Sequence, residues 1–228
     1  MNRSHNILRA QEDHVWDVAV IGGGASGLGV ALDALSRDLS VILVDKADFA
    51  KGTSSRSTKL VHGGVRYLQQ GNVSLVLEAL QERGLLQRNA PHLVRNLAFV
   101  VPNYDWWEGP FYGIGMKVYD MLAGRQNFGR SKHLSRDETL EHLPTIEPDG
   151  LRGGVIYYDG QFDDARLSIN MAQTLVEQGG LALNYCKVTG LTKSADGVVS
   201  GVEATDQETG QSYTLEAGAV INAPGIFT

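Results

Sequence analysis

The chain has 228 residues, of which 43% are hydrophobic and 20% are charged, proportions typical of a soluble globular protein with a sizeable core. Its 20 basic and 26 acidic residues give a net charge of −6, which argues against nucleic acid as a partner. The single cysteine, Cys186, excludes an internal disulfide and a cysteine-based metal cluster, so no metal site is expected.

The first residues of the chain carry no recognisable targeting signal. Residues 1–14 are polar, contain charges of both signs and lack the apolar centre of a signal peptide. We expect residues 1–15 to form a flexible extension. No apolar run is long enough to span a bilayer. The expected location is the cytoplasm, with peripheral attachment to the cytoplasmic face of the membrane left open.

A glycine-rich turn follows the first apolar run. Residues 18–21 have the apolar, β-branched character of a buried parallel strand. They lead into Gly22-x-Gly24-x-x-Gly27 and then into the helical spacing of Leu28, Ala31 and Leu35. In dinucleotide-binding domains the first glycine permits a tight turn and the second lets backbone approach a pyrophosphate. The third allows the helix to pack on the strand. The phosphates would bind at the N-terminus of this helix.

A second apolar run, residues 41–45, ends in an acid, Asp45. An acidic residue at this separation in sequence from the glycines can accept hydrogen bonds from ribose hydroxyls. The strand, loop, helix, strand and acid together predict a dinucleotide site rather than a glycine turn without a ligand.

The segment 53–68 is dense in polar groups. Hydroxyl side chains occupy most of the positions from Thr53 to Thr58, and Lys59, His62, Arg66 and Tyr67 follow. Such a set of donors can replace the hydration of an anionic ligand. On composition alone, a solvated serine-rich loop explains the segment equally well.

The middle of the chain predicts further elements. We expect a helix over 72–87, a strand over 97–101 that Pro102 ends, and a short helix opened by the capping box Ser135-x-x-Glu138. Residues 104–124 are rich in aromatic residues. Packing within a small subdomain is the favoured explanation of this composition. A membrane-contacting surface around Trp106, Trp107, Phe111, Tyr112 and Lys117 is the alternative.

The last third predicts a strand over 153–158, a helix over 165–178 capped by Asp163-Asp164, and strands over 181–193, 198–205, 211–217 and 219–221. The predicted organisation is a core with its ligand loop at 16–90, a substrate-binding subdomain at 91–160, and a return to the first domain at 161–228.

With these residues assembled, the sequence resembles the FAD-dependent glycerol-3-phosphate dehydrogenase family. Three motifs carry the resemblance: residues 20–27 (VIGGGASG), residues 52–68 (GTSSRSTKLVHGGVRYL) and residues 157–167 (YYDGQFDDARL). The implied fold is α/β, a Rossmann-like FAD-binding domain of the glutathione-reductase/amino-acid-oxidase type. An α+β substrate subdomain is inserted into it, and the domain is truncated at the C-terminus.

The resemblance also implies site residues. Those expected at the flavin are Gly22, Gly24, Gly27, Asp45, Ser54, Ser55, Lys59, His62, Val188 and Gly225. Val188 would offer backbone to the adenine. Residues 222–225 match a second flavin-contacting turn, in which Pro224 departs from the family pattern and removes an N–H donor.

The implied reaction oxidises sn-glycerol 3-phosphate to dihydroxyacetone phosphate, and its electrons pass to a quinone or another respiratory acceptor. Arg66 suits the substrate phosphate because its fork binds two oxygens, and Tyr67 can add a donor. A surface ion pair is the alternative for Arg66. His62 is the candidate catalytic residue, although hydrogen bonding beside the flavin is its favoured role, and a base later in the protein is equally acceptable.

Family members are around twice as long as this chain, so the sequence is expected to be a fragment or a truncated reading frame that does not turn over alone. The alternatives are an oxygen-using glycerophosphate oxidase, another amino-acid-oxidase-like flavoprotein, and an inactive polypeptide.

Overall fold

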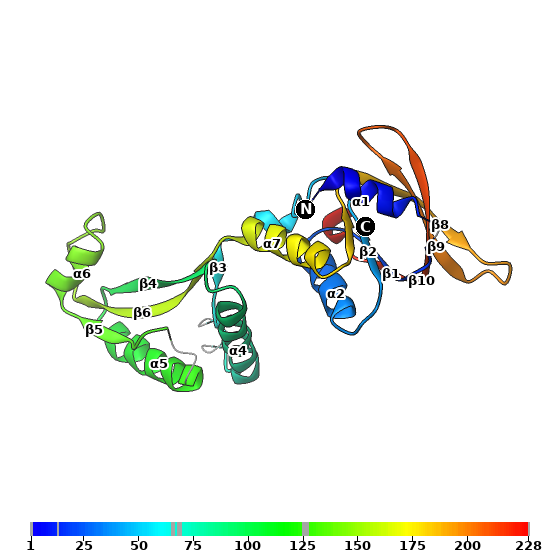
Figure 1. Ribbon diagram of the computed structural model, residues 1–228. Coiled ribbons are helices and arrows are strands. Elements are labelled where there is room, and N and C mark those ends of the chain that lie inside the picture. The colour runs from blue at the N-terminus through cyan, green and yellow to red at the C-terminus, as the bar shows by residue number, and fades with distance from the viewer. Residues whose placement is uncertain (1, 13, 65–66, 68–69, 125–127, 228) are drawn as a thin grey trace. The chain divides into compact units, whose positions relative to one another are not determined.

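The computed structural model describes residues 2–12, 14–64, 67, 70–124 and 128–227, whose elements are shown in Figure 1. The chain forms two compact units: unit 1 spans residues 1–57 and 164–228, and unit 2 spans residues 58–163. The first boundary lies at residue 57 rather than at the predicted residue 90. The reason is that the segment after Ser57 forms strand β3 (Leu60–Val61), which joins the sheet of unit 2.

Unit 1 is built on one sheet whose strand order is β7-β2-β1-β10-β9-β8. Strands β7, β2, β1 and the later part of β10 are parallel, whereas β10, β9 and β8 form an antiparallel meander. The strand bounds are β1 (Trp16–Ile21), β2 (Val41–Val44), β7 (Leu181–Leu183), β8 (Cys186–Lys193), β9 (Val199–Asp206) and β10 (Ser212–Asn222).

Both faces of the parallel strands are covered. Val20 and Leu43 pack with helices α2 (Ala25–Leu35) and α7 (Asp164–Glu177), whereas their neighbours Ala19 and Ile42 belong to a second core cluster with residues of the meander. Alternate residues of a strand point to opposite faces, so covering both faces requires a strand that is apolar throughout. All four residues of β2 are buried. The α/β fold with a parallel sheet predicted from the sequence is confirmed.

The N-terminal segment differs from the flexible extension that was expected. Residues Arg3–Ala10 form helix α1, which begins after Asn2, whose side chain accepts a hydrogen bond from the N–H of His5. The buried Asn6 donates from Nδ2 to the carbonyl of Ala182 at 3.1 Å. The helix is held by contacts with distant residues, which the polar composition of the segment does not reveal.

Three of the predicted strands are also arranged differently. The run 181–193 divides at Tyr185, whose φ of 52° breaks the extended conformation, so β7 pairs with β2 and β8 with β9. Conversely, the runs 211–217 and 219–221 form the single strand β10. It pairs with β9 as far as Glu216 and with β1 from Ala217 onward.

Unit 2 is organised around strand β6 (Gly153–Phe162), which pairs antiparallel with β3, with β4 (Val94–Asn103) and with β5 (Lys132–Leu134). Its described helices are α4 (Val73–Asn89), α5 (Glu108–Ala123) and α6 (Arg136–His142). The capping box of Ser135 and Glu138 opens α6 as predicted.

Pro102 does not end the strand before it, as was predicted, but lies within β4 opposite Gly154. The strand order β3-β6-β4 places β4 at an edge of the described sheet. A proline is tolerated on an edge strand because its missing N–H can face away from the sheet.

No helix in the described parts of the chain combines the length and the apolarity needed to cross a membrane.

Candidate functional site

The glycine turn after β1 is closed tightly by backbone. Gly22 has φ +113°, and a Cβ placed on it would lie 2.2 Å from the carbonyl oxygen of Ala223. A Cβ on Gly27 would lie 1.9 Å from the oxygen of Gly22. Since no side chain fits at either position, the loop can pass between β10 and α2 only with glycine there. At Gly24 a Cβ would come within 3.1 Å of Ser54 Oγ, so this glycine faces the serine.

The N-terminus of α2 is met by a hydroxyl group. The N–H of Ala25 donates to Ser54 Oγ at 2.8 Å, and Ser54 and Ser55 both belong to the short helix η1 (Thr53–Ser55). The first N–H groups of a helix have no partners within the helix and attract anions. The structure therefore brings Ser54, predicted from a segment about thirty residues away, to the glycine turn.

Asp45 accepts hydrogen bonds from backbone N–H groups in and near the same turn. Its Oδ2 accepts a hydrogen bond from the N–H of Gly23 at 2.6 Å, and its Oδ1 accepts one from the N–H of Ala47 at 2.8 Å. Each carboxylate oxygen has a second lone pair, so further hydroxyl donors can still be accepted. Gly23, which the sequence analysis gave no role, contributes the donor, and a Cβ there would lie 2.6 Å from the Phe49 ring.

A cavity of about 580 Å³ opens at the carboxyl ends of β1 and β2, beside β8. Asp45 and Val188 both line it, as do Lys46 and Pro224. A bulge in β8 next to Val188 interrupts the pairing with β9 at this wall. The strands β2 and β7 lie on one side of β1 and β10 on the other, and ligands of open α/β sheets bind outside the carboxyl ends of strands at such a point.

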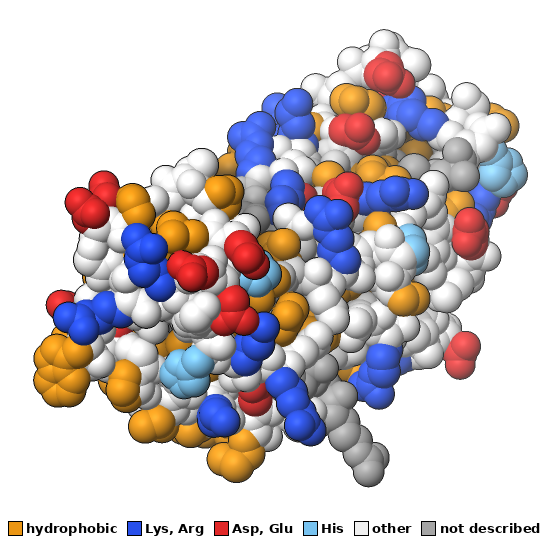
Figure 2. Space-filling model, turned by 90° about the vertical axis from the view of Figure 1, so that its left-hand side faces the viewer, with side chains coloured by type: hydrophobic (Ala, Val, Ile, Leu, Met, Phe, Trp, Pro, Cys, Tyr) orange, Lys and Arg blue, Asp and Glu red, His pale blue; other side chains and the backbone are white. Residues whose placement is uncertain are grey.

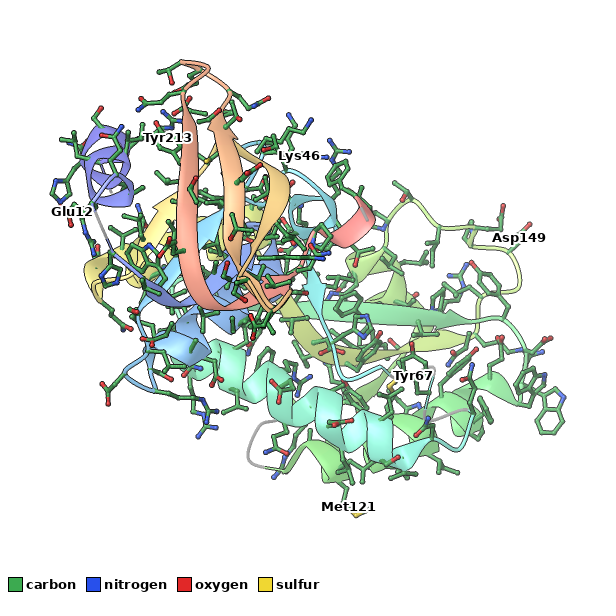
Figure 3. All side chains as sticks on the ribbon, turned by 90° about the vertical axis from the view of Figure 1, so that its right-hand side faces the viewer. Glu12, Lys46, Tyr67, Met121, Asp149 and Tyr213 are labelled. Carbon is green, nitrogen blue, oxygen red and sulfur yellow. The ribbon has the colours of Figure 1, made fainter. Side chains whose placement is uncertain are left out.

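The second predicted turn reaches the same cavity. Gly225 has φ +61° and begins the short helix η3 (Gly225–Phe227). Lys46 Nζ lies 3.7 Å from the centroid of the Phe227 ring, and Figure 3 shows Lys46 beside this last helix of the described chain. The cavity, the glycine turn, the helix N-terminus and the acid fit the parts of a dinucleotide.

The remaining predicted residues belong to unit 2. Lys59 has φ 61° and its carbonyl accepts from the N–H of Phe162 at 3.0 Å. His62 is exposed, and its Nδ1 accepts from the N–H of Gly64 at 3.1 Å. Tyr67 is exposed. Arg66, predicted to hold the substrate phosphate, lies outside the described residues.

The aromatic-rich segment 104–124 of unit 2 contains both buried and exposed apolar side chains. Met116 and Tyr119 of α5 are buried, whereas Trp106, Phe111 and Met121 are exposed. Figure 3 shows Met121 pointing away from the ribbon, and Figure 2, which views unit 2 from the side of α5 and α6, shows hydrophobic side chains among charged ones. Packing explains the inner face of α5, and the outer face stays apolar and exposed.

Sequence reasoning missed a buried polar group in unit 2, formed by Arg83, Tyr119 and Asp159. One signal was available: Arg83 follows Val76 and Leu80 at helical spacing, so it lies on the buried face of α4. A charged residue on such a face needs a buried partner. Asp159 lies in the motif 157–167, but the sequence analysis gave this residue no role.

The fold and the site define a dinucleotide-binding domain of the α/β class, with helices on one face of its parallel sheet and a β-meander on the other. The family described as DAO, FAD dependent oxidoreductase, matches residues 17–228. The chain belongs to this family, and the FAD predicted from the sequence is the cofactor named in the family's description.

Three comparisons illustrate the similarity. The mitochondrial glycerol-3-phosphate dehydrogenase of Schizosaccharomyces pombe is 43% identical over 230 residues, which cover 97% of this chain and 35% of that protein. The crystal structure of the glycerol-3-phosphate dehydrogenase of Bacillus halodurans, complexed with FAD, is 35% identical with a TM-score of 0.74. That match covers 99% of this chain and 37% of the other. The FAD-bound L-alpha-glycerophosphate oxidase of Mycoplasma pneumoniae, 20% identical with a TM-score of 0.65, covers 93% of this chain and 54% of its own and shares the fold. The chain thus spans about a third of the length of the dehydrogenases it matches.

Proposed function

We propose that the protein containing this chain oxidises sn-glycerol 3-phosphate to dihydroxyacetone phosphate with FAD and passes the electrons to a quinone. The observation that carries the proposal is the 35% identity over 99% of the chain to a glycerol-3-phosphate dehydrogenase complexed with FAD. The glycine turn and Asp45 described above supply a site of the matching kind.

In this proposal unit 1 holds the pyrophosphate, the ribose and the adenine of FAD. The turn at Gly22, Gly24 and Gly27 and the N-terminus of α2 receive the pyrophosphate, and Asp45 accepts from the ribose. The backbone near Val188, which lines the cavity, is assigned to the adenine. FAD, when bound, supplies the hydride acceptor, and the protein orients the substrate against it.

Unit 2 is assigned to the substrate and to the flavin edge. Arg66 and Tyr67 bind the substrate phosphate, because a guanidinium binds two phosphate oxygens and a phenol adds a donor. His62 accepts from Gly64 at Nδ1, so its neutral ring carries the proton on Nε2 and donates there. This geometry favours a hydrogen-bonding role for His62 over that of the general base.

Reduction of a quinone requires access to lipid, and the exposed face of α5 offers apolar side chains for it. Phe111 and Lys117 are exposed on α5 and Trp106 is exposed just before it, a combination that suits a membrane interface. The site of action we assign is therefore the cytoplasmic face of a membrane, with peripheral contact.

The cofactor and substrate are tested on the complete purified protein. We expect a yellow protein whose flavin absorbance is bleached by glycerol 3-phosphate without oxygen, and faster reoxidation by a quinone analogue than by oxygen. A colourless protein that binds NAD would contradict the cofactor, and faster reoxidation by oxygen would indicate a glycerophosphate oxidase.

The role of Arg66 is tested by comparing two substrates. Loss of a charged hydrogen-bond partner costs roughly 1.5–3 kcal/mol, so Arg66→Ala should lower kcat/KM for glycerol 3-phosphate by about tenfold or more. Arg66→Lys should lose less, and the loss should shrink for glycerol, which has no phosphate. Equal losses for both substrates would assign Arg66 to the fold or to the flavin.

A further inference from the structure

Unit 2 contains a charged pair that is sealed from solvent. Arg83 on α4 is 0% exposed and Asp159 on β6 is 2% exposed, and Arg83 Nη1 lies 2.6 Å from Asp159 Oδ1. The guanidinium also lies 4.3 Å from the centroid of the Phe128 ring. A buried ion pair contributes little net stability compared with apolar side chains of the same size. Its presence therefore calls for an explanation beyond stability.

The pair holds one hydroxyl group in a fixed orientation. The Tyr119 OH, on α5, donates to Asp159 Oδ2 at 2.8 Å and lies 3.4 Å from Arg83 Nη1, which donates to it. Burial, and then the charge of Asp159, raise the pKa of Tyr119 well above its usual value, so the hydroxyl keeps its proton at every physiological pH. A phenol has one hydrogen to donate, and here Asp159 receives it. The oxygen is thereby left to accept.

The hydroxyl accepts from a backbone group outside the helices and strands. The N–H of Gly63 donates to Tyr119 OH at 2.9 Å in a buried position. A Cβ on Gly63 would lie 2.3 Å from that oxygen and 2.4 Å from Leu80, so only glycine lets the backbone come this close. Gly64 follows with φ +71°, and its N–H donates to His62 Nδ1 at 3.1 Å.

These contacts connect a buried charge to an exposed ring. Asp159 orients the Tyr119 hydroxyl, the hydroxyl fixes Gly63, and Gly64 in turn holds the imidazole of His62. We propose that Tyr119 is a positioning residue, fixed by the Arg83–Asp159 pair, that sets the backbone of Gly63 and hence the direction of the His62 ring. The consequence for the flavin rests on the proposed function, in which His62 lies beside it.

The test replaces only the hydroxyl groups. Tyr119→Phe removes the acceptor of the Gly63 N–H. Tyr157→Phe is the matched control, because the Tyr157 ring packs edge-on against the Tyr119 ring at 6.4 Å and its hydroxyl makes none of these bonds. Hydrogen–deuterium exchange of the FAD-loaded protein is followed by mass spectrometry on a peptide covering residues 60–67. The flavin absorption spectrum and FAD affinity are measured on the same samples.

We expect Tyr119→Phe to speed exchange in this peptide by about fivefold, the factor for one hydrogen bond of ordinary net strength, and to shift the flavin spectrum. Peptides from α4 and β6 should be unchanged, and so should Tyr157→Phe. Unchanged exchange in residues 60–67, or an equal rise throughout unit 2, would overturn the positioning role. Faster exchange with an unchanged flavin spectrum and affinity would uphold the positioning of the loop and refute the placement of His62 beside the flavin.

Amide exchange in the unmodified protein tests the same proposal if the Tyr119→Phe protein does not fold. In the unmodified protein, the Gly63 N–H should exchange far more slowly than that of Gly71, whose surroundings are open. Equal exchange at the two glycines would show that the Tyr119 bond does not hold Gly63 and would likewise overturn the proposal.

Discussion

The two units build their candidate sites in different ways. In unit 1 the ligand-facing turn is shaped by glycines and backbone N–H groups, and the one acid, Asp45, accepts from neighbouring backbone. In unit 2 the turn at residues 62–64 donates from Gly63 to the Tyr119 hydroxyl, which is itself hydrogen-bonded to the buried pair of Arg83 and Asp159. The turn in unit 1 therefore depends on the lack of side chains at its glycines. The turn in unit 2 depends on a buried charge that keeps its partner.

The difference decides what a substitution does. Where space matters, one methyl group is enough to displace the backbone. Where a paired charge matters, removing one partner is costly, while removing both is tolerated.

The largest effect is expected in unit 2. Arg83→Ala leaves Asp159 charged and buried without its partner, and should lower the free energy of unfolding by about 3–5 kcal/mol. The double variant Arg83→Met, Asp159→Leu should lose much less, since apolar side chains of similar size replace the pair. Urea unfolding of the three proteins gives the comparison. A double variant as unstable as Arg83→Ala would show that packing, and not the unpaired charge, dominates.

A smaller loss of stability is expected at the glycine turn of unit 1, together with a large loss of FAD. Gly27→Ala places a Cβ 1.9 Å from the Gly22 oxygen, and overpacking of this kind costs about 1–3 kcal/mol. The displaced loop should also release FAD, measured by flavin fluorescence. Gly29→Ala is the matched control on the same helix, because its nearest neighbour is Met171 Cε at 3.9 Å. It should leave FAD binding unchanged, and equal FAD loss in both variants would assign the effect to α2 as a whole.

The same distinction explains what could be predicted from the sequence. The strands, the glycine turn and Asp45 follow local rules of spacing, and the structure brings Ser54 to the turn as a ligand loop requires. The path of β10 and the helix at Arg3–Ala10 depend on partners far along the chain. The group formed by Arg83, Tyr119 and Asp159 joins three residues far apart in the chain, and only the helical spacing of Arg83 from Val76 and Leu80 gave a local sign of it.

The contact of α1 with the meander contains a buried carboxyl group whose charge should make the stability depend on pH. The Asp206 carboxyl is 1% exposed, and burial alone would raise its pKa. The N–H groups of Glu208 and Thr209 and the Arg3 guanidinium, 2.8 Å away, outweigh this and lower the pKa below its usual value. Its stabilising effect is therefore complete above the unfolded value of about 3.9 and is lost as the pH falls through the lower, folded value.

Asp206→Asn should lower the unfolding free energy by about 1–3 kcal/mol at pH 7, and the difference from the unmodified protein should shrink below about pH 4. Urea unfolding at several pH values measures it. Asp33→Asn, at the exposed pair of Asp33 with Arg37, is the control and should change little. A constant difference down to acid pH would show that the Asp206 charge is not what stabilises the contact.

The smallest effect on stability is expected at the two exposed tryptophans that precede α5, where an apolar surface of unit 2 can be compared with one of unit 1. Trp106 and Trp107 are 76% and 47% exposed, so replacing both with serine should change the unfolding free energy by less than about 0.5 kcal/mol each. If this face contacts lipid, the double variant should lose about tenfold or more in vesicle binding, because burying a large apolar side chain contributes about 1.5–3 kcal/mol. Flotation with anionic vesicles measures the loss.

The double variant Leu8→Ser, Val198→Ser is the matched control, since both residues are exposed apolar positions of unit 1. Equal flotation of all three proteins would exclude Trp106 and Trp107 from any membrane contact, and equal losses in both double variants would indicate general surface hydrophobicity instead of a defined surface.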